Sequence, residues 1–207
     1  MSGLLLNFRN TVILSVILAL FVIFGFAHVH GSMDLQFWEA VLRWLHVLSG
    51  ILWIGLLYYF NFVQIRKMPD IPAELKPAVS KYIAPEALFW FRWAALFTFV
   101  FGLALAGLRD HFDQPGYLAN TLSFDISDHF QSPQYALMGL GMWLATIMFL
   151  NVWGIIWPNQ KIALGIVEAD ADKKAKAAKM ATLASRVNTL LSIPMLVSMT
   201  MYQTLNG

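Results

Sequence analysis

The chain has 207 residues, of which 58% are hydrophobic and only 13% are charged. Soluble domains carry about 25% charged residues, so the composition is that of an integral membrane protein. The net charge of +2 is too small to favour nucleic-acid binding. Because the chain has no cysteine, disulfides, iron–sulfur clusters and covalently attached c-type heme are excluded. A redox centre must therefore be held by side chains such as His, Met, Lys or Tyr.

Long apolar segments recur along the whole chain. Each is long enough to cross the hydrocarbon core of a bilayer as a helix. We therefore predict an all-α fold, a polytopic membrane helical bundle forming a single domain over residues 1–207. The five predicted helices are 11–27, 37–63, 87–108, 135–157 and 187–205.

The first and last of these segments are less regular than the others. Arg9 precedes the first, as in a signal peptide, but the run is long and no A-x-A cleavage pattern follows Ala27. We expect it to be retained as a membrane anchor. The fifth segment is the most polar, because Asn188, Ser192 and Gln203 interrupt it.

The stretch from 162 to 185 is rich in alanine and places acidic residues before basic ones. Glu168, Asp170 and Asp172 precede Lys173 and the lysines that follow it. Acid before base suits the helix dipole, so we predict a short surface helix over 162–185 on the cytoplasmic side.

Loop charges predict the orientation, because cytoplasmic loops are enriched in Lys and Arg. Arg9 precedes the first segment, and lysines are concentrated in the second–third and fourth–fifth loops. The third–fourth loop is acidic, with Asp110, Asp113, Asp125 and Asp128. We therefore expect a protein of the bacterial inner membrane, with a cytoplasmic N-terminus and a periplasmic C-terminus.

One histidine lies well inside a predicted helix. His46 is some two turns from the outer end of 37–63, and ionisable groups at such depth tend to mark functional sites. At helical spacing it shares a face with four residues, namely Arg43, Ser49, Gly50 and Trp53.

This face suits heme b. His46 supplies an imidazole for iron, Gly50 leaves room for a flat macrocycle, Trp53 forms an aromatic wall, and Arg43 pairs with a propionate or another carboxylate. The alternative is that His46 hydrogen-bonds a neighbouring helix while Gly50 allows close packing. Spacing alone leaves both open.

The other polar residues favour structural roles. His28, His30, His111 and His129 lie near the outer surface, where a copper or zinc site is an alternative to simple hydration. Asn61, Arg92, Asn151 and Asn188 lie toward the cytoplasmic half. They favour hydrogen bonding between helices over lining a quinone or substrate cavity.

Several blocks of sequence resemble a known family. They are RWLHVLSGILWIGLLYYFNFVQ (43–64), APEALFWFRW (84–93), NVWGIIWPNQ (151–160) and SRVNTLLSIPML (185–196). Together they are similar to the membrane domain of PuuD-type urate oxidases, in which a periplasmic cytochrome c domain follows and accepts electrons from urate oxidation. The cysteine-free chain departs from that pattern, since c-type heme needs cysteine, and a separate cytochrome c could substitute for the fused domain.

A fainter resemblance is to HemJ-type protoporphyrinogen oxidases, small membrane proteins that bind heme b. It is carried by His46 with the following Trp-x-Gly, and by Arg186, Asn188, Ile193 and Pro194. The family's later lysine has no counterpart in 135–157. Both resemblances converge on His46, and the second implies that it matters for heme binding.

The sequence thus favours a redox protein that binds heme b through His46 and exchanges electrons with a periplasmic cytochrome c or a quinone. The alternatives are a protoporphyrinogen oxidase-like enzyme and a non-catalytic membrane subunit of a respiratory complex. Substrate, second heme ligand and oligomeric state stay open.

The topology is testable with fusions at Gly207. If the five segments all cross, a reporter active only in the periplasm gives a signal and one active only in the cytoplasm does not. Cytoplasmic activity at Gly207 means that the polar fifth segment fails to cross.

Overall fold

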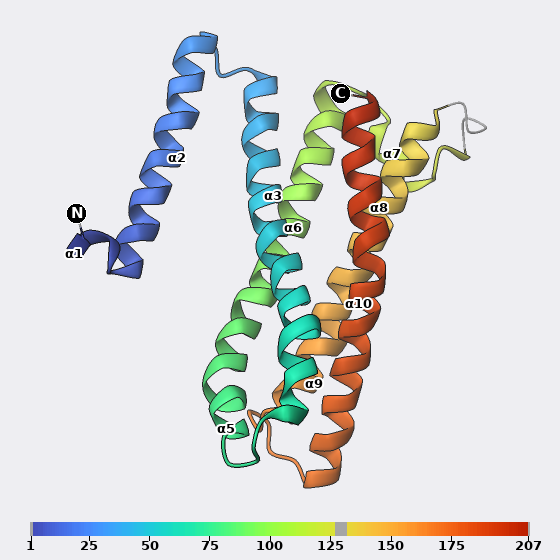
Figure 1. The fold of residues 1–207 in the computed structure, drawn as a ribbon. Helices are drawn as coiled ribbons and strands as arrows, with labels where there is room; N and C mark the ends of the chain where they lie inside the picture. Colours follow the sequence, from blue (N-terminus) through green and yellow to red (C-terminus); the bar gives the residue numbers. More distant parts are fainter. Residues whose placement is uncertain (1, 127–131, 207) are drawn as a thin grey trace.

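The computed structural model describes residues 2–126 and 132–206. It is a bundle of long helices, with one helix, α2, standing beside the rest (Figure 1). The long helices are α2 (Phe8–His30), α3 (Leu35–Tyr58), α6 (Ala84–Phe112), α8 (Pro133–Asn151) and α10 (Ala171–Asn206). The short α-helices are α1 (Ser2–Leu5), α4 (Ile65–Lys67), α5 (Lys76–Ala78), α7 (Tyr117–Leu122) and α9 (Trp157–Ala163). A 3₁₀ turn, η2 (Met68–Asp70), follows α4, and three π-helical segments join longer helices: η1 (Tyr59–Gln64), η3 (Val79–Ile83) and η5 (Val152–Ile156).

The all-α prediction is confirmed. The described chain has five helices long and apolar enough to cross a membrane: Phe8–Val29, Leu35–Asp70, Lys76–Phe112, Pro133–Ala163 and Ala171–Tyr202. Local sequence sets several of their ends. Asp34 caps α3 by accepting a hydrogen bond from the Phe37 amide, and Gly31 closes α2 in the left-handed conformation, at φ +80°.

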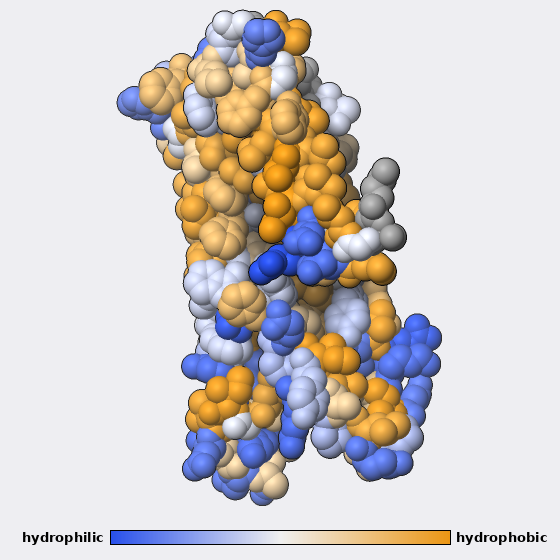
Figure 2. Space-filling model, turned by 90° about the vertical axis from the view of Figure 1, so that its left-hand side faces the viewer, coloured by the Kyte–Doolittle hydropathy of each residue, from blue (hydrophilic) through white to orange (hydrophobic). Residues whose placement is uncertain are grey.

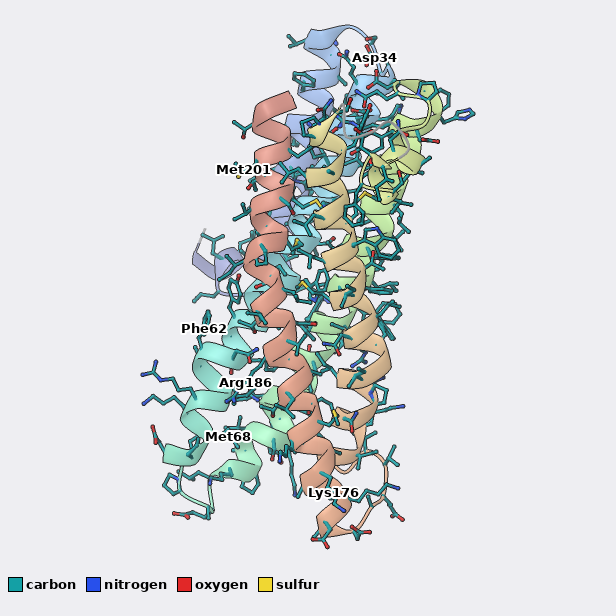
Figure 3. All side chains as sticks on the ribbon, turned by 90° about the vertical axis from the view of Figure 1, so that its right-hand side faces the viewer. Asp34, Phe62, Met68, Lys176, Arg186 and Met201 are labelled. Atoms are coloured by element: carbon teal, nitrogen blue, oxygen red, sulfur yellow. The ribbon has the colours of Figure 1, made fainter. Side chains whose placement is uncertain are left out.

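The bundle helices are longer than predicted. The continuous helix Leu35–Asp70 has 36 residues, about 54 Å at 1.5 Å per residue, whereas Phe8–Val29 has 22, about 33 Å. α2 ends and α3 begins at the upper end in Figure 1, so the lower part of the bundle extends about 20 Å beyond α2. Apolar residues dominate the upper part in Figure 2, and hydrophilic ones gather in the lower part. Figure 3 places Lys176 and Arg186 there.

The prediction of a separate surface helix over 162–185 is wrong. α9 ends at Ala163, and from Ala171 onward the chain is the first half of α10, which continues to Asn206. No glycine or proline interrupts residues 173–193, so nothing stops the helix. Ala177 and Ala181 are buried, and α10 packs along α9.

Polar side chains of α10 tie it to its neighbours. Asn188 accepts from Asn151 Nδ2 at 2.7 Å and donates to the Met148 carbonyl at 3.0 Å. Ser185 accepts a hydrogen bond from Asn61 Nδ2 at 2.8 Å, and Ser192 forms a hydrogen bond with the Tyr58 hydroxyl at 3.0 Å. Asn188 and Ser192, two of the residues that make the fifth segment polar, therefore bond between helices, as lipid-embedded polar groups must. The side chain of the third, Gln203, lies outside the described part of the chain.

We predict that Asn188→Ala destabilises the bundle by about 0.6–2 kcal/mol, the range of hydrogen bonds between membrane helices. Unfolding in mixed detergent–dodecyl sulfate micelles measures the loss. Asn159→Ala is the control, because Asn159 bonds only its own helix, at the Ile155 carbonyl. Equal losses for the two variants contradict the prediction.

Candidate functional site

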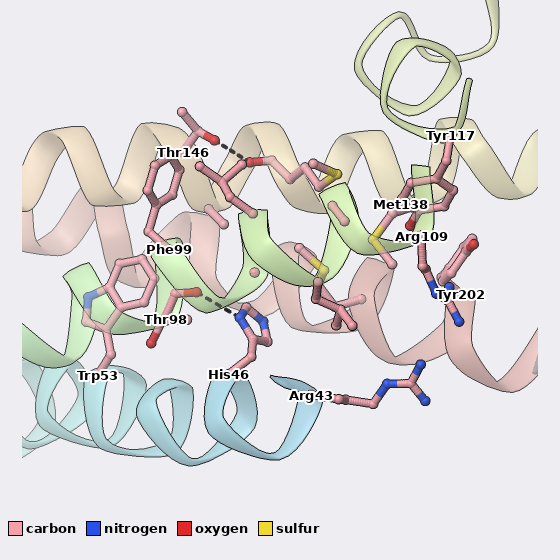
Figure 4. A pocket seen from close by; sticks show the side chains of 17 residues that line it. Arg43, His46, Trp53, Thr98, Phe99, Arg109, Tyr117, Met138, Thr146 and Tyr202 are labelled. Atoms are coloured by element: carbon pink, nitrogen blue, oxygen red, sulfur yellow. Dashed lines mark hydrogen bonds between the residues drawn. The ribbon is translucent and has the colours of Figure 1, made fainter. Parts of the chain in front are cut away.

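A cavity of about 100 Å³ lies in the upper half of the bundle, between α3, α6, α7, α8 and α10 (Figure 4). We call it the upper cavity. Its wall is mostly apolar, and its polar groups gather around His46 and toward the upper end. The lining residues with polar or sulfur-containing side chains are Arg43, His46, Trp53, Thr98, Arg109, Tyr117, Thr146 and Tyr202, together with Met138, Met142 and Met199.

His46 is oriented by the backbone of α6. Its Nδ1 lies 2.8 Å from the Thr98 carbonyl oxygen (Figure 4). A carbonyl only accepts, so Nδ1 carries the proton and donates it. In the neutral imidazole Nε2 then holds the lone pair, and no described residue hydrogen-bonds to it. A histidine that donates one ring N–H to a carbonyl and keeps the other nitrogen free has the arrangement of most metal-ligating histidines.

The close approach of α3 to α6 depends on Gly102. A Cβ at this position would lie 2.9 Å from His46 Cε1 and 3.0 Å from Nδ1, closer than real Cβ contacts. The imidazole therefore packs against bare backbone, which brings it within reach of the Thr98 carbonyl. Gly102 is the residue that makes this ring position sterically accessible.

A shared carboxylate holds two arginines at the upper end of the cavity. Glu39 Oε2 lies 3.8 Å from Arg43 Nη2 and 3.5 Å from Arg109 Nε. Glu39 and Arg109 are largely buried, and Arg43 is about one-third exposed. One carboxylate against two guanidiniums leaves a net positive charge, which suits an anionic group.

Two tyrosines close the same end. Arg109 Cζ lies 5.9 Å from the centre of the Tyr117 ring, and the Tyr117 and Tyr202 rings meet edge to face at 6.5 Å. Burial, with the neighbouring Tyr202, raises the pKa of Tyr117, so this phenol stays neutral and keeps its O–H as a donor.

Three of the four predicted site residues line the cavity. Arg43, His46 and Trp53 do so, and Arg43 does pair with a carboxylate. Gly50 does not line it; its Cβ position faces Thr98 Cγ2 at 3.7 Å, so it serves helix packing.

Sequence reasoning missed the residues that other elements contribute to the site. Glu39 is one turn before Arg43 on α3 and had a detectable signal, the i, i+4 spacing. Gly102, Arg109 and Tyr117 come from α6 and α7, and nothing in the local sequence aligns them with His46.

The structure describes the side chains of two other histidines. His28 and His111 are exposed, and His111 packs on Phe112. The His30 side chain and His129 lie outside the described residues. Within residues 2–126 and 132–206 no three His, Asp or Glu residues are grouped to hold a metal ion.

Comparison with known families bears on the second half of the chain. Residues 116–203 match the family model described as urate oxidase N-terminal. This family match confirms the resemblance to the urate oxidase membrane domain. Neither the curated proteins nor the solved structures compared with the chain give a match, and no comparison supports the protoporphyrinogen oxidase resemblance.

The urate oxidase N-terminal match covers part of the site. It includes Tyr117, Tyr202 and the three cavity methionines, whereas His46 and the two arginines precede it. Of the four resembling sequence blocks, 151–160 and 185–196 lie inside it.

We predict that Gly102→Ala displaces the His46 ring and costs about 1–3 kcal/mol of stability, as overpacking does. In ¹⁵N-histidine spectra the Nδ1–H signal of His46 should shift as its bond to Thr98 is lost. Gly107→Ala on the same helix is the control, because no atom lies within 4 Å of its Cβ position. Unchanged His46 signals in Gly102→Ala contradict the prediction.

Proposed function

We propose that the chain is a membrane redox protein of the urate oxidase N-terminal type that holds heme b in the upper cavity, with His46 Nε2 as an iron ligand. The observation that carries the proposal is the bond from His46 Nδ1 to the Thr98 carbonyl at 2.8 Å. It fixes the neutral tautomer with its lone pair on Nε2, the form that binds iron.

The remaining donor set fits the same group. Arg43 and Arg109 share one carboxylate, so they retain positive charge for heme propionates. Trp53 and the apolar wall suit the macrocycle, and Tyr117 keeps its phenolic proton as a donor. When bound, heme b supplies a reversible one-electron couple.

The upper cavity must widen before it can hold heme. An apolar cavity of about 150 Å³ holds one benzene, so a cavity of about 100 Å³ must widen for a porphyrin. Met138, Met142 and Met199 fill its wall, and methionine, with three rotatable bonds, yields more readily than branched side chains. Their displacement is the adjustment that the proposal requires.

The cavity's position suggests where electrons are exchanged. It lies near the upper end, which the loop-charge argument assigns to the periplasmic side of a bacterial inner membrane. We propose a periplasmic cytochrome c or a membrane quinone as the partner at this end. Residues 1–207 contain no cysteine, so the covalently attached heme of a cytochrome c would lie outside them.

The heme proposal predicts that His46→Ala abolishes heme b binding while the protein stays inserted and folded. The test is the reduced-minus-oxidised absorption spectrum of purified protein, with heme quantified per chain. Arg43→Ala should weaken heme affinity or shift its potential without abolishing binding, because Arg109 remains.

His111→Ala is the matched control, since His111 is exposed at the upper end of α6 and should keep its heme. The proposal fails if purified wild-type protein carries no heme b and takes up none, or if His46→Ala retains a full complement with an unchanged spectrum. A non-catalytic membrane subunit then becomes the better account.

A further inference from the structure

A second cavity, of about 230 Å³, lies in the lower part of the bundle. We call it the lower cavity. Its wall comes from η1, α4 and η2, which extend α3, from η3 and the start of α6, from η5 and α9, and from the first half of α10. These are the parts that extend beyond α2 (Figure 1), so the lower cavity is separate from the upper one.

All three π-helical segments of the described chain meet at this cavity. Phe60 and Gln64 come from η1, Val79 and Ser80 from η3, and Ile156 from η5. A π segment gives up regular i, i+4 bonding and is retained mostly where a site needs the altered backbone. Three helices that each leave regular α-helical geometry next to one cavity indicate that the cavity is a binding site.

The cavity wall carries no charged side chain. Its polar groups are amides and hydroxyls, from Gln64, Gln160, Ser80, Thr182 and Ser185. Its apolar wall includes Phe60 and Phe91, whose rings meet edge to face at 5.7 Å. Such a wall favours an uncharged molecule with a ring.

A buried amide oxygen in the wall indicates which polar groups the ligand carries. Gln64 Oε1 is buried and receives no hydrogen bond from any described residue. Asn61 Oδ1, one turn earlier, is also buried without a donor from the described residues, but Asn61 does not line the cavity. A buried acceptor without a donor is costly, so Gln64 Oε1 in the cavity wall favours a ligand with an N–H or O–H group.

We infer that the lower cavity is a binding site for a small uncharged ring molecule that carries O–H or N–H donors, with Gln64 as the principal acceptor. The size agrees, since about 150 Å³ accommodates benzene and the lower cavity, at about 230 Å³, leaves room for polar substituents. The site is independent of heme binding at His46.

The test compares two para-disubstituted benzenes as probes. Hydroquinone has two O–H groups, and 1,4-dimethoxybenzene has none. Binding to the full chain in nanodiscs is followed by saturation-transfer NMR and calorimetry. Wild-type protein should prefer hydroquinone, and Gln64→Leu should reduce that preference by about five- to tenfold, the value of one hydrogen bond. Comparing the preference between variants cancels the partition of each probe into lipid.

A second cavity variant and a control variant test whether the effect is specific to the lower cavity. Gln160→Leu changes a second cavity amide on a different helix, in case Gln64→Leu fails to fold, and should also reduce the preference. Gln134→Leu, on α8 away from the cavity, is the matched control and should leave it unchanged. The inference is overturned if hydroquinone does not bind, or if the preference persists in both cavity variants.

Discussion

The upper half of the molecule depends on one contact, the imidazole of His46 against the backbone of α6. Within a bilayer no water satisfies a polar ring, so both its position and its proton must be set by protein. The Thr98 carbonyl does this at 2.8 Å, and Gly102 leaves the space for it. The same contact holds α3 and α6 together and determines which nitrogen faces the cavity. The packing role of His46 and the ligand role that we propose for it are therefore compatible, because one hydrogen bond serves both.

The rest of the bundle follows the same constraint with different residues. Asn151, Asn188 and Ser192 are buried, and each makes a hydrogen bond across helices. Their bonds hold a comparatively polar helix, α10, against α3 and α8. By contrast, α2 buries little beyond Ala27 and is apolar on all sides, as a helix surrounded by lipid must be. Polarity within a span thus marks a helix with many neighbours.

Sequence reasoning succeeded where one helix carries the signal and failed where several must meet. Apolar length predicted five spans. One face of one helix singled out Arg43, His46 and Trp53 as heme-site residues, and all three line the upper cavity. Gly50 was chosen as the small residue beside His46 because it lies one turn away, but the glycine that touches the ring is Gly102 on another helix. The surface helix over 162–185 was wrong for a related reason. Its charges describe a solvated helix end equally well, and the burial of Ala177 and Ala181 against neighbouring helices is a tertiary contact that local sequence does not reveal.

The two cavities differ in the charge they accept. In the upper one, Arg43 and Arg109 outnumber the single carboxylate of Glu39, so an anionic group is stabilised. The lower one presents neutral amides and hydroxyls only, so a charged ligand would lose hydration without a counter-ion. Between them lie apolar residues of the core, including Leu57, Ala95 and Met148. A group that fits one cavity is thus disfavoured in the other, and the bundle keeps two chemically distinct sites apart across the thickness of its core.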